Sequence, residues 1–146
     1  MLEDCFHLGI KAIIRNGEGK ILLLKVNPKQ LKEFNDKPYW DIPGGRVHKG
    51  NTTEETLRRE VEEETGITSI KSCTPFSMVL SNIRIPIEDD SVGLILSSYL
   101  CDVDNIGEIK ISDEHIEFDW FTPQKAKELL SVKYPKGFVE KLSGLE

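Results

Sequence analysis

GGRVHKGNTTEETLRREVEEETGI, residues Gly44 to Ile67, is the stretch of this chain that decides its fold. It begins at a glycine turn, crosses a polar loop and enters a segment with helical spacing. Thr52 is a good N-cap, and Glu55, three residues later, completes a capping box. Gly66 stands where a left-handed C-terminal cap is expected. The pattern therefore predicts a helix over Thr53 to Thr65.

Three carboxylates share one face of this predicted helix. Glu60, Glu63 and Glu64 are spaced i, i+3, i+4, so they fall within an arc of about 100°. Like charges at this spacing repel one another by roughly 0.2–0.5 kcal/mol per pair, and a hard cation would convert the repulsion into ligation. Ligands made only of oxygen favour magnesium or manganese over zinc. A solvated acidic face is the alternative. The glycines before the helix favour a phosphate-and-metal site, because they let backbone amides approach a phosphate closely.

The same stretch resembles the Nudix box, the signature of the MutT-like Nudix hydrolase family. Gly45 matches the first glycine of the box, and Arg59 to Ile67 (REVEEETGI) matches its second half in order. The residues before it, Trp40 to Gly45 (WDIPGG), resemble the lead-in of the family. One position departs from the box, because Asn51 stands where the family has its first Glu. Asn51 can still accept a hydrogen bond from Arg59 but brings no charge, and we expect Glu63, four residues after Arg59, to compensate.

The resemblance implies hydrolysis of a diphosphate linkage in a nucleoside diphosphate derivative, with Mg²⁺ or Mn²⁺ as cofactor and a small nucleotide as partner. It assigns roles to six residues: metal ligands Glu60, Glu63 and Glu64, a carboxylate-orienting Arg59, and Gly44 and Gly45, whose backbone faces the diphosphate. Either Glu63 or Glu64 is the expected general base. A Nudix-fold module that binds a nucleotide without cleaving it is the alternative, and Asn51 alone favours it.

Family members often recruit another carboxylate from outside the box. Ser112 to Phe121 (SDEHIEFDWF) resembles the segment that supplies it. Glu114 and Glu117 are the possible additional carboxylates, and an exposed loop charge is the alternative for each. His115 is expected to be a surface or half-buried residue rather than one that positions water.

Three further features have two interpretations. Pro28 to Lys37 is either a solvated loop or a segment that shapes the substrate entrance. Trp40 is expected to be a core residue of a strand rather than a platform for a nucleobase. Glu88 to Asp90 is expected to form a hairpin tip rather than a second metal site.

The remaining chain is rich in apolar and β-branched runs. His7 to Arg15 and Ile21 to Val26 are predicted to pair as a hairpin through the turn at Asn16 to Gly19. Further strands are predicted at Tyr39 to Ile42, Phe76 to Ile85, Gly93 to Val103 and Glu117 to Phe121, and Pro123 opens a helical region. The expected fold class is α/β (α+β): a Nudix-type α/β/α sandwich with a mixed, partly antiparallel sheet.

The length and the net charge of the chain limit its possible functions. A chain of 146 residues is expected to form a single domain over residues 1–146. Its net charge, 19 − 25 = −6, disfavours binding to nucleic acid polymers or anionic membranes. No apolar run approaches the roughly 20 residues that span a bilayer. The chain has an odd number of cysteines, and their thiols are expected to be reduced in a cytoplasmic protein. Monomer and homodimer both stay open.

Overall fold

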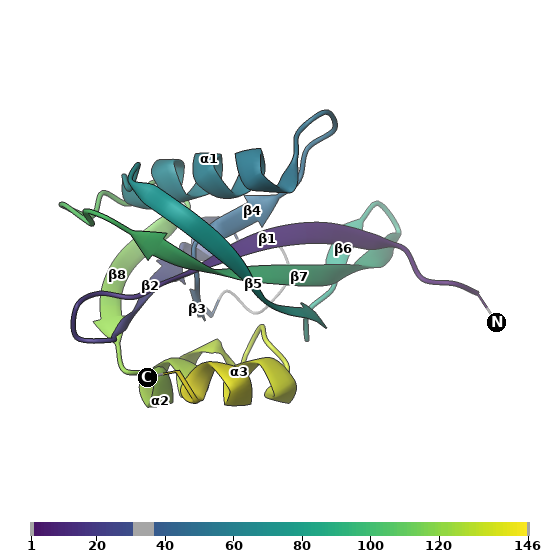
Figure 1. The fold of residues 1–146 in the computed structure, drawn as a ribbon. Coiled ribbons are helices and arrows are strands. Elements are labelled where there is room, and N and C mark those ends of the chain that lie inside the picture. Colours follow the sequence, from purple (N-terminus) through teal and green to yellow (C-terminus); the bar gives the residue numbers. More distant parts are fainter. Residues whose placement is uncertain (1, 31–36, 146) are drawn as a thin grey trace.

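A computed structural model describes residues 2–30 and 37–145 of the chain. Its strands are β1 (Phe6–Ile14), β2 (Ile21–Val26), β3 (Trp40–Asp41), β4 (Gly44–Arg46), β5 (Ile70–Leu80), β6 (Ile85–Ile87), β7 (Asp90–Val103) and β8 (His115–Phe121). Its helices are the 3₁₀ turn η1 (Pro28–Gln30), α1 (Thr53–Thr65), α2 (Pro123–Leu130) and α3 (Lys136–Ser143). Figure 1 shows α1 above the strands and α2 with α3 below them. The predicted α/β/α sandwich is therefore confirmed.

The strands form two sheets. One has the order β4-β1-β7-β5, with β6 added to β7, and the other has the order β3-β2-β8. The pairing of β1 with β7 is parallel, and the other strand pairs are antiparallel. This confirms the expected mixed arrangement.

Strands β1 and β2 separate two apolar cores. Alternate side chains of a strand point to opposite faces, so each of these strands contributes to both cores. On the α1 side the buried cluster includes Ile10, Ala12, Ile14, Leu22, Leu24, Leu57 and Val61. On the other side it includes Ile13, Ile21, Leu23, Ala126, Leu130, Tyr134 and Phe138. This burial on both faces explains why β1 and β2 are nearly continuous apolar runs.

The predicted hairpin of the first two strands is wrong. Strand β1 pairs with β4 and β7, whereas β2 pairs with β3 and β8. A single bridge joins them, between Arg15 and Ile21. The turn that follows Asn16 is present, since the Asn16 amide donates to the Lys20 carbonyl at 2.9 Å. The strands then diverge into different sheets, because both edges of each strand are taken by other partners.

The strand predicted at Phe76 to Ile85 is shifted in the structure. Strand β5 starts at Ile70, ends at Leu80 and pairs along one edge with β7. Its first half is polar because the strand lies at the edge of its sheet, and this polarity hid it from the apolar pattern. A register shift follows Pro75, which cannot donate to the ladder.

The acidic segment before β7 is a hairpin tip, as expected. Ile87 pairs with Asp90, which leaves Glu88 and Asp89 as a two-residue turn. Glu88 has a φ of 45°, a left-handed conformation typical of such turns. These carboxylates lie on the turn and line none of the cleft described below.

The three cysteines are free thiols. Cys73 and Cys101 face each other across β5 and β7 with their sulfur atoms 3.5 Å apart, and Cys5 is exposed. Within residues 2–30 and 37–145, no helix is long and apolar enough to cross a membrane.

Candidate active site

Helix α1 has the bounds that its caps predict. The Thr52 hydroxyl accepts a hydrogen bond from the Glu55 amide at 3.1 Å. Gly66 ends the helix with a φ of 81°, and its amide donates to the Glu62 carbonyl. Leu57 and Val61 are buried against the strands, which fixes the adjoining carboxylates of α1 relative to the sheet.

Gly44 and Gly45 do not form the predicted turn but are part of strand β4, which pairs with β1. The reason for two glycines is close approach. A Cβ on Gly44 would lie 2.1 Å from the Ile10 carbonyl oxygen, and one on Gly45 would lie 2.4 Å from Cδ of Glu60. The Gly44 amide donates to Oε1 of Glu64 at 2.9 Å. This amide therefore holds a carboxylate of α1 and is not open to a phosphate.

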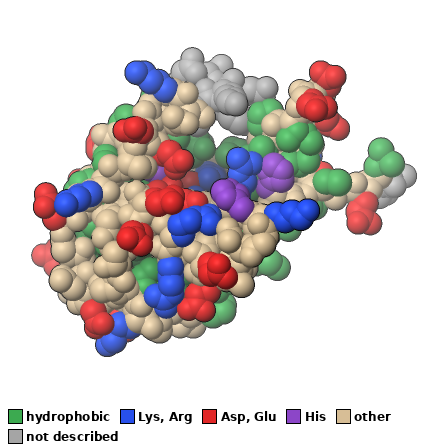
Figure 2. All heavy atoms as spheres, turned by 90° about the horizontal axis from the view of Figure 1, so that it is seen from above, with side chains coloured by type: hydrophobic (Ala, Val, Ile, Leu, Met, Phe, Trp, Pro, Cys, Tyr) green, Lys and Arg blue, Asp and Glu red, His purple; other side chains and the backbone are tan. Residues whose placement is uncertain are grey.

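A cleft of about 490 Å³ lies where α1, β4 and the start of β8 meet. All three predicted carboxylates line it, Glu60, Glu63 and Glu64, whereas Glu62 is exposed outside it. Glu114 lines the same cleft. Figure 2 shows acidic, basic and histidine side chains lying next to one another in the middle of the face seen from above. The structure thus brings together residues 50 positions apart in the sequence.

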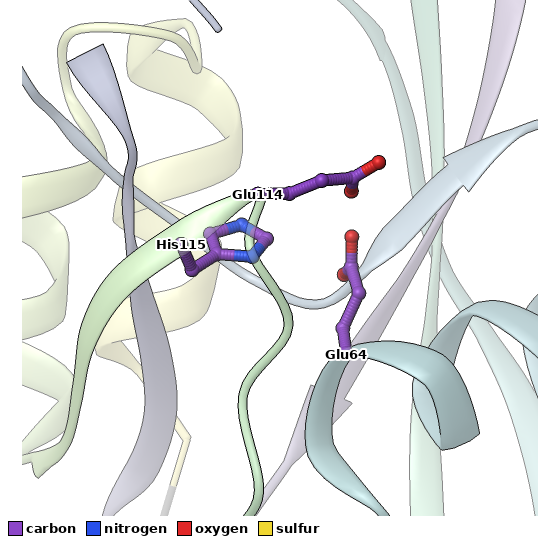
Figure 3. Close-up of side chains that lie close together, drawn as sticks. All are labelled: Glu64, Glu114 and His115. Atoms are coloured by element: carbon purple, nitrogen blue, oxygen red, sulfur yellow. The ribbon is translucent and has the colours of Figure 1, made fainter. Parts of the chain in front are cut away.

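Glu64, Glu114 and His115 form the tightest group in this cleft. One ligand atom from each lies within 4.8 Å of the others. Figure 3 shows Glu64 rising from α1 toward Glu114, with the His115 ring beside them. His115 is half-buried, as expected, but it faces the carboxylates rather than the outer surface.

Burial shapes the ionisation of this group. Glu64 is only 4% exposed, and desolvation raises its pKa to about 8, although Lys11 and the Gly44 amide oppose the shift. Burial also raises the pKa of Glu60, with its hydrogen bond to Arg59 opposing. Burial lowers the pKa of His115, so its ring is neutral at pH 7. A neutral imidazole can act as a ligand.

The donors in the cleft fit a divalent cation. A carboxylate whose pKa is raised by burial gains stability when a positive ion replaces its proton. Nδ1 of His115 is buried and has no hydrogen-bond partner among the described residues. Carboxylate oxygens with at most one imidazole nitrogen are ligands suited to a hard or borderline divalent ion.

Arg59 binds Asn51 directly. Its Nη1 donates to Oδ1 of Asn51 at 2.8 Å, and its Nη2 donates to Oε1 of Glu60 at 3.3 Å. The expected compensation by Glu63 is wrong, because Glu60 makes the charged contact. Helical side chains point back toward the N-terminus, so Arg59 reaches Asn51 before the helix rather than Glu63 one turn ahead. Asn51 therefore still orients the arginine without adding charge.

Of the two additional carboxylates, Glu114 lies in the cleft and Glu117 is exposed outside it. Glu114 precedes β8, whereas Glu117 lies within it, beyond a bulge in the β2–β8 pairing. Val26 pairs with His115 and the adjacent Lys25 pairs with Glu117. Because paired residues share a face and adjacent residues do not, Glu117 points away from the face that His115 and Val26 present to the cleft.

The structure bears on two other expectations, one for Trp40 and one for the segment Pro28 to Lys37. Trp40 packs edge-on against Phe121 at the margin of the core, with ring centroids 5.0 Å apart, so its role as a core residue is confirmed. Of the segment Pro28 to Lys37, Gln30 lines the cleft. Residues 31–36 lie outside the described part of the chain, and their role at an entrance stays a prediction.

The sequence pattern missed a buried ionic cluster in the floor of the cleft. Asp41 is 3% exposed and accepts from Lys11 at 3.0 Å, from Lys133 at 2.6 Å and from the Tyr134 hydroxyl at 2.6 Å. Lys11 was a visible signal, because it interrupts the apolar run of β1. Lys133 carried none, since a lysine in the short loop between α2 and α3 has no neighbouring pattern that predicts its burial.

Known relatives share part of this chain. The NUDIX domain family model matches residues 6–142. A putative 8-oxo-dGTP diphosphatase of Bacillus subtilis (strain 168) is 43% identical over 58 residues, which are 40% of this chain and 34% of the relative. An ADP-ribose pyrophosphatase of the same strain is 39% identical over 66 residues, 44% of this chain and 34% of the relative. The matches span about a third of the length of these curated relatives.

Solved structures match over nearly the whole chain. The MutT protein from Methanosarcina mazei Go1 has a TM-score of 0.67 and 28% identity, over 97% of this chain and 94% of that one. A MutT NUDIX hydrolase from Burkholderia pseudomallei shares the fold, with a TM-score of 0.66 and 24% identity over 97% of this chain and 98% of that one. With the family model spanning all but the ends of the sequence, this chain belongs to the NUDIX domain family.

Proposed function

We propose that this chain is a metal-dependent pyrophosphohydrolase that cleaves the diphosphate linkage of a nucleoside diphosphate derivative. The observation that carries the proposal is the convergence of Glu60, Glu63, Glu64 and Glu114 in one cleft against the glycine strand β4. The names of the two curated relatives, a diphosphatase and a pyrophosphatase, support this class of reaction.

The four carboxylates would hold Mg²⁺ or Mn²⁺, which would neutralise charge on the diphosphate and supply Lewis acidity. Glu63 is exposed in the cleft, and no hydrogen bond with another described residue fixes it. We assign it the role of base that takes the proton of the attacking water. Glu64, held by the Gly44 amide, has a fixed position suited to a ligand. Arg59 orients Glu60 through their ion pair.

A panel of nucleoside diphosphate derivatives, incubated with Mg²⁺ and resolved by chromatography, tests this function. We expect cleavage that a chelator abolishes. Glu63→Gln should lower kcat by roughly 10²–10³, the range seen when a group that stabilises a transition state is lost. Glu62→Gln is the matched control, because Glu62 is on the same helix but faces solvent, and its kcat should be unchanged. Equal losses in both variants would contradict the assignment.

Asn51 favours one other function, a nucleotide-binding module without turnover. If a nucleotide binds with metal but is not cut by the wild-type protein, this account replaces the enzyme. Asn51→Glu then becomes the decisive variant, since it would restore the missing charge beside Arg59. Appearance of cleavage in that variant would identify Asn51 as the cause.

Glycine substitutions in β4 should separate stability from activity. Gly45→Ala places its Cβ against the end of the flexible Glu60 side chain, which can move. We expect a fold close to wild type and a loss of metal affinity or kcat of about 10–100-fold. Gly44→Ala instead meets backbone at Ile10 and requires a positive φ, so it should lower stability by about 1–3 kcal/mol or more. Thermal denaturation and metal titration of both variants measure the two effects. A Gly45→Ala protein with wild-type metal affinity and kcat would contradict the placement of Glu60.

Several narrower properties stay predictions. These are the choice between Mg²⁺ and Mn²⁺, a cytoplasmic location, a small nucleotide rather than a nucleic acid polymer as partner, and a monomeric or homodimeric state.

A further inference from the structure

The floor of the cleft carries two buried lysines that share one counterion. Lys11 is 6% exposed and Lys133 is 9% exposed, yet both line the cleft. Both ammonium groups donate to the same oxygen, Oδ2 of Asp41. The other carboxylate oxygen accepts from the Tyr134 hydroxyl and the Ile42 amide. Asp41 is therefore fully hydrogen-bonded by groups of the protein.

The two lysines use fewer of their possible hydrogen bonds than Asp41 does. An ammonium group has three N–H donors. Lys11 uses two of them, on Asp41 and on the Ile42 carbonyl. Lys133 uses one among the described residues, the bond to Asp41. Although burial alone would raise the pKa of Asp41, the two lysines hold it well below its usual range. Asp41 is therefore ionised at pH 7, and the cluster carries a net charge of +1.

This excess charge faces a cleft whose opposite wall is acidic. The carboxylates of α1 can hold a phosphate only through a cation, whereas Lys133 can bind one directly with two N–H groups. A largely buried charged donor that is incompletely bonded is costly unless a partner arrives. The geometry points to an oxoanion subsite: Lys133 binds a phosphate oxygen of the substrate, and Lys11 and Asp41 position its ammonium group. This inference rests on the proposed function for its choice of phosphate.

A purely structural role for the cluster does not explain why it contains two lysines. Asp41 joins β3 to the loop after α2, and one lysine with Tyr134 would be enough to satisfy it. A second ammonium group adds positive charge beyond what Asp41 alone balances. Apolar side chains, among them Ile85, Leu94 and Leu96, line the same cleft, and a less polar surrounding strengthens the attraction between a buried charge and an anion.

The test is binding of inorganic phosphate and of AMP by calorimetry in EDTA, where neither metal nor turnover contributes. We expect Lys133→Met to weaken at least one of the two probes about tenfold or more, the range for a hydrogen bond to a charged group. Lys133→Arg should retain binding within a few-fold. Lys136→Met is the matched control, because Lys136 lies three residues away with a side chain that is 86% exposed, and it should bind both probes like wild type.

A measurement on the wild-type protein keeps the test decisive if Lys133→Met does not fold. Phosphate should shift the side-chain NMR resonance of Lys133, identified through its absence in Lys133→Arg, and should leave that of Lys136 unchanged. Binding of both probes that is equal in all folded variants, or no shift of the Lys133 resonance, overturns the inference. Because no step requires catalysis, the subsite can fail while diphosphate hydrolysis stands, and hydrolysis can fail while the subsite stands.

Discussion

Glu64→Gln is expected to slow diphosphate cleavage strongly while making the metal-free protein more stable at alkaline pH. The substitution removes a charged ligand from the cleft, which should lower kcat by roughly 10²–10³. Its amide oxygen can still accept the hydrogen bond that the Gly44 amide gives to Oε1 of Glu64. The helix should therefore keep its place on β4, and the loss of activity should not come from unfolding.

The gain in stability follows from the raised pKa of Glu64. Burial raises this pKa from 4.5 to about 8. Below pH 4.5 the carboxyl is protonated in both the folded and the unfolded chain. Between pH 4.5 and 8 the unfolded chain releases the proton and the folded chain keeps it, so stability falls as the pH rises. Glutamine has no proton to release. The difference in Tm between Glu64→Gln and wild type should therefore grow from pH 5 to pH 9 in EDTA.

Magnesium should make wild type more stable than Glu64→Gln, which reverses their order of stability in EDTA. A cation that binds only the folded state stabilises it by mass action, and the wild-type cleft offers it a carboxylate that Glu64→Gln lacks. Differential scanning calorimetry at pH 5, 7 and 9, with EDTA and with Mg²⁺, measures both effects. Glu62→Gln, exposed on the same helix, should follow wild type throughout. A pH-independent difference in Tm would show that Glu64 is not a buried, proton-binding carboxyl.

Local rules were enough to predict the carboxylate helix. Its N-cap, its C-cap and the spacing of Glu60, Glu63 and Glu64 all depend on residues within one segment, and the structure confirms each of them. The family resemblance rested on the same segment. What it could not give was the charged partner of Arg59, which is Glu60 rather than Glu63 and depends on the direction in which a helical side chain points.

The sequence pattern could not predict which strands pair when they lie far apart in the chain. Apolar runs identified β1 and β2 as strands, but the period of a strand does not name its neighbour. Both edges of β1 are occupied by β4 and β7, which begin 30 and 76 residues after β1 ends at Ile14 (44 − 14 and 90 − 14). Likewise the bulge at Lys25 and Val26 decides that His115 faces the cleft and Glu117 does not. A one-residue insertion has no signature in the apolar pattern, yet it reverses the face of every later side chain.

The second large effect is expected for Asp41→Asn, which should lower stability by about 3–5 kcal/mol, the range for removing one partner of a buried ion pair. Asparagine keeps the shape of the side chain but leaves Lys11 and Lys133 buried without the negative charge that they share. For a domain of this length each kcal/mol lowers Tm by roughly 2–4 °C. Asp104→Asn is the matched control, because Asp104 pairs with Lys71 on the surface at 3.3 Å, and it should cost less than about 1 kcal/mol.

The pH dependence of this loss identifies its cause. The lysines hold the folded-state pKa of Asp41 below its value of 3.8 in the unfolded chain. Its contribution is therefore fully present above pH 3.8 and is lost as the pH falls through the lower folded pKa. The gap in Tm between wild type and Asp41→Asn should stay constant from pH 5 to pH 8 and narrow only in stronger acid. A small gap at neutral pH would mean that the two ammonium groups do not depend on Asp41, and the cationic floor of the cleft would then need another counterion.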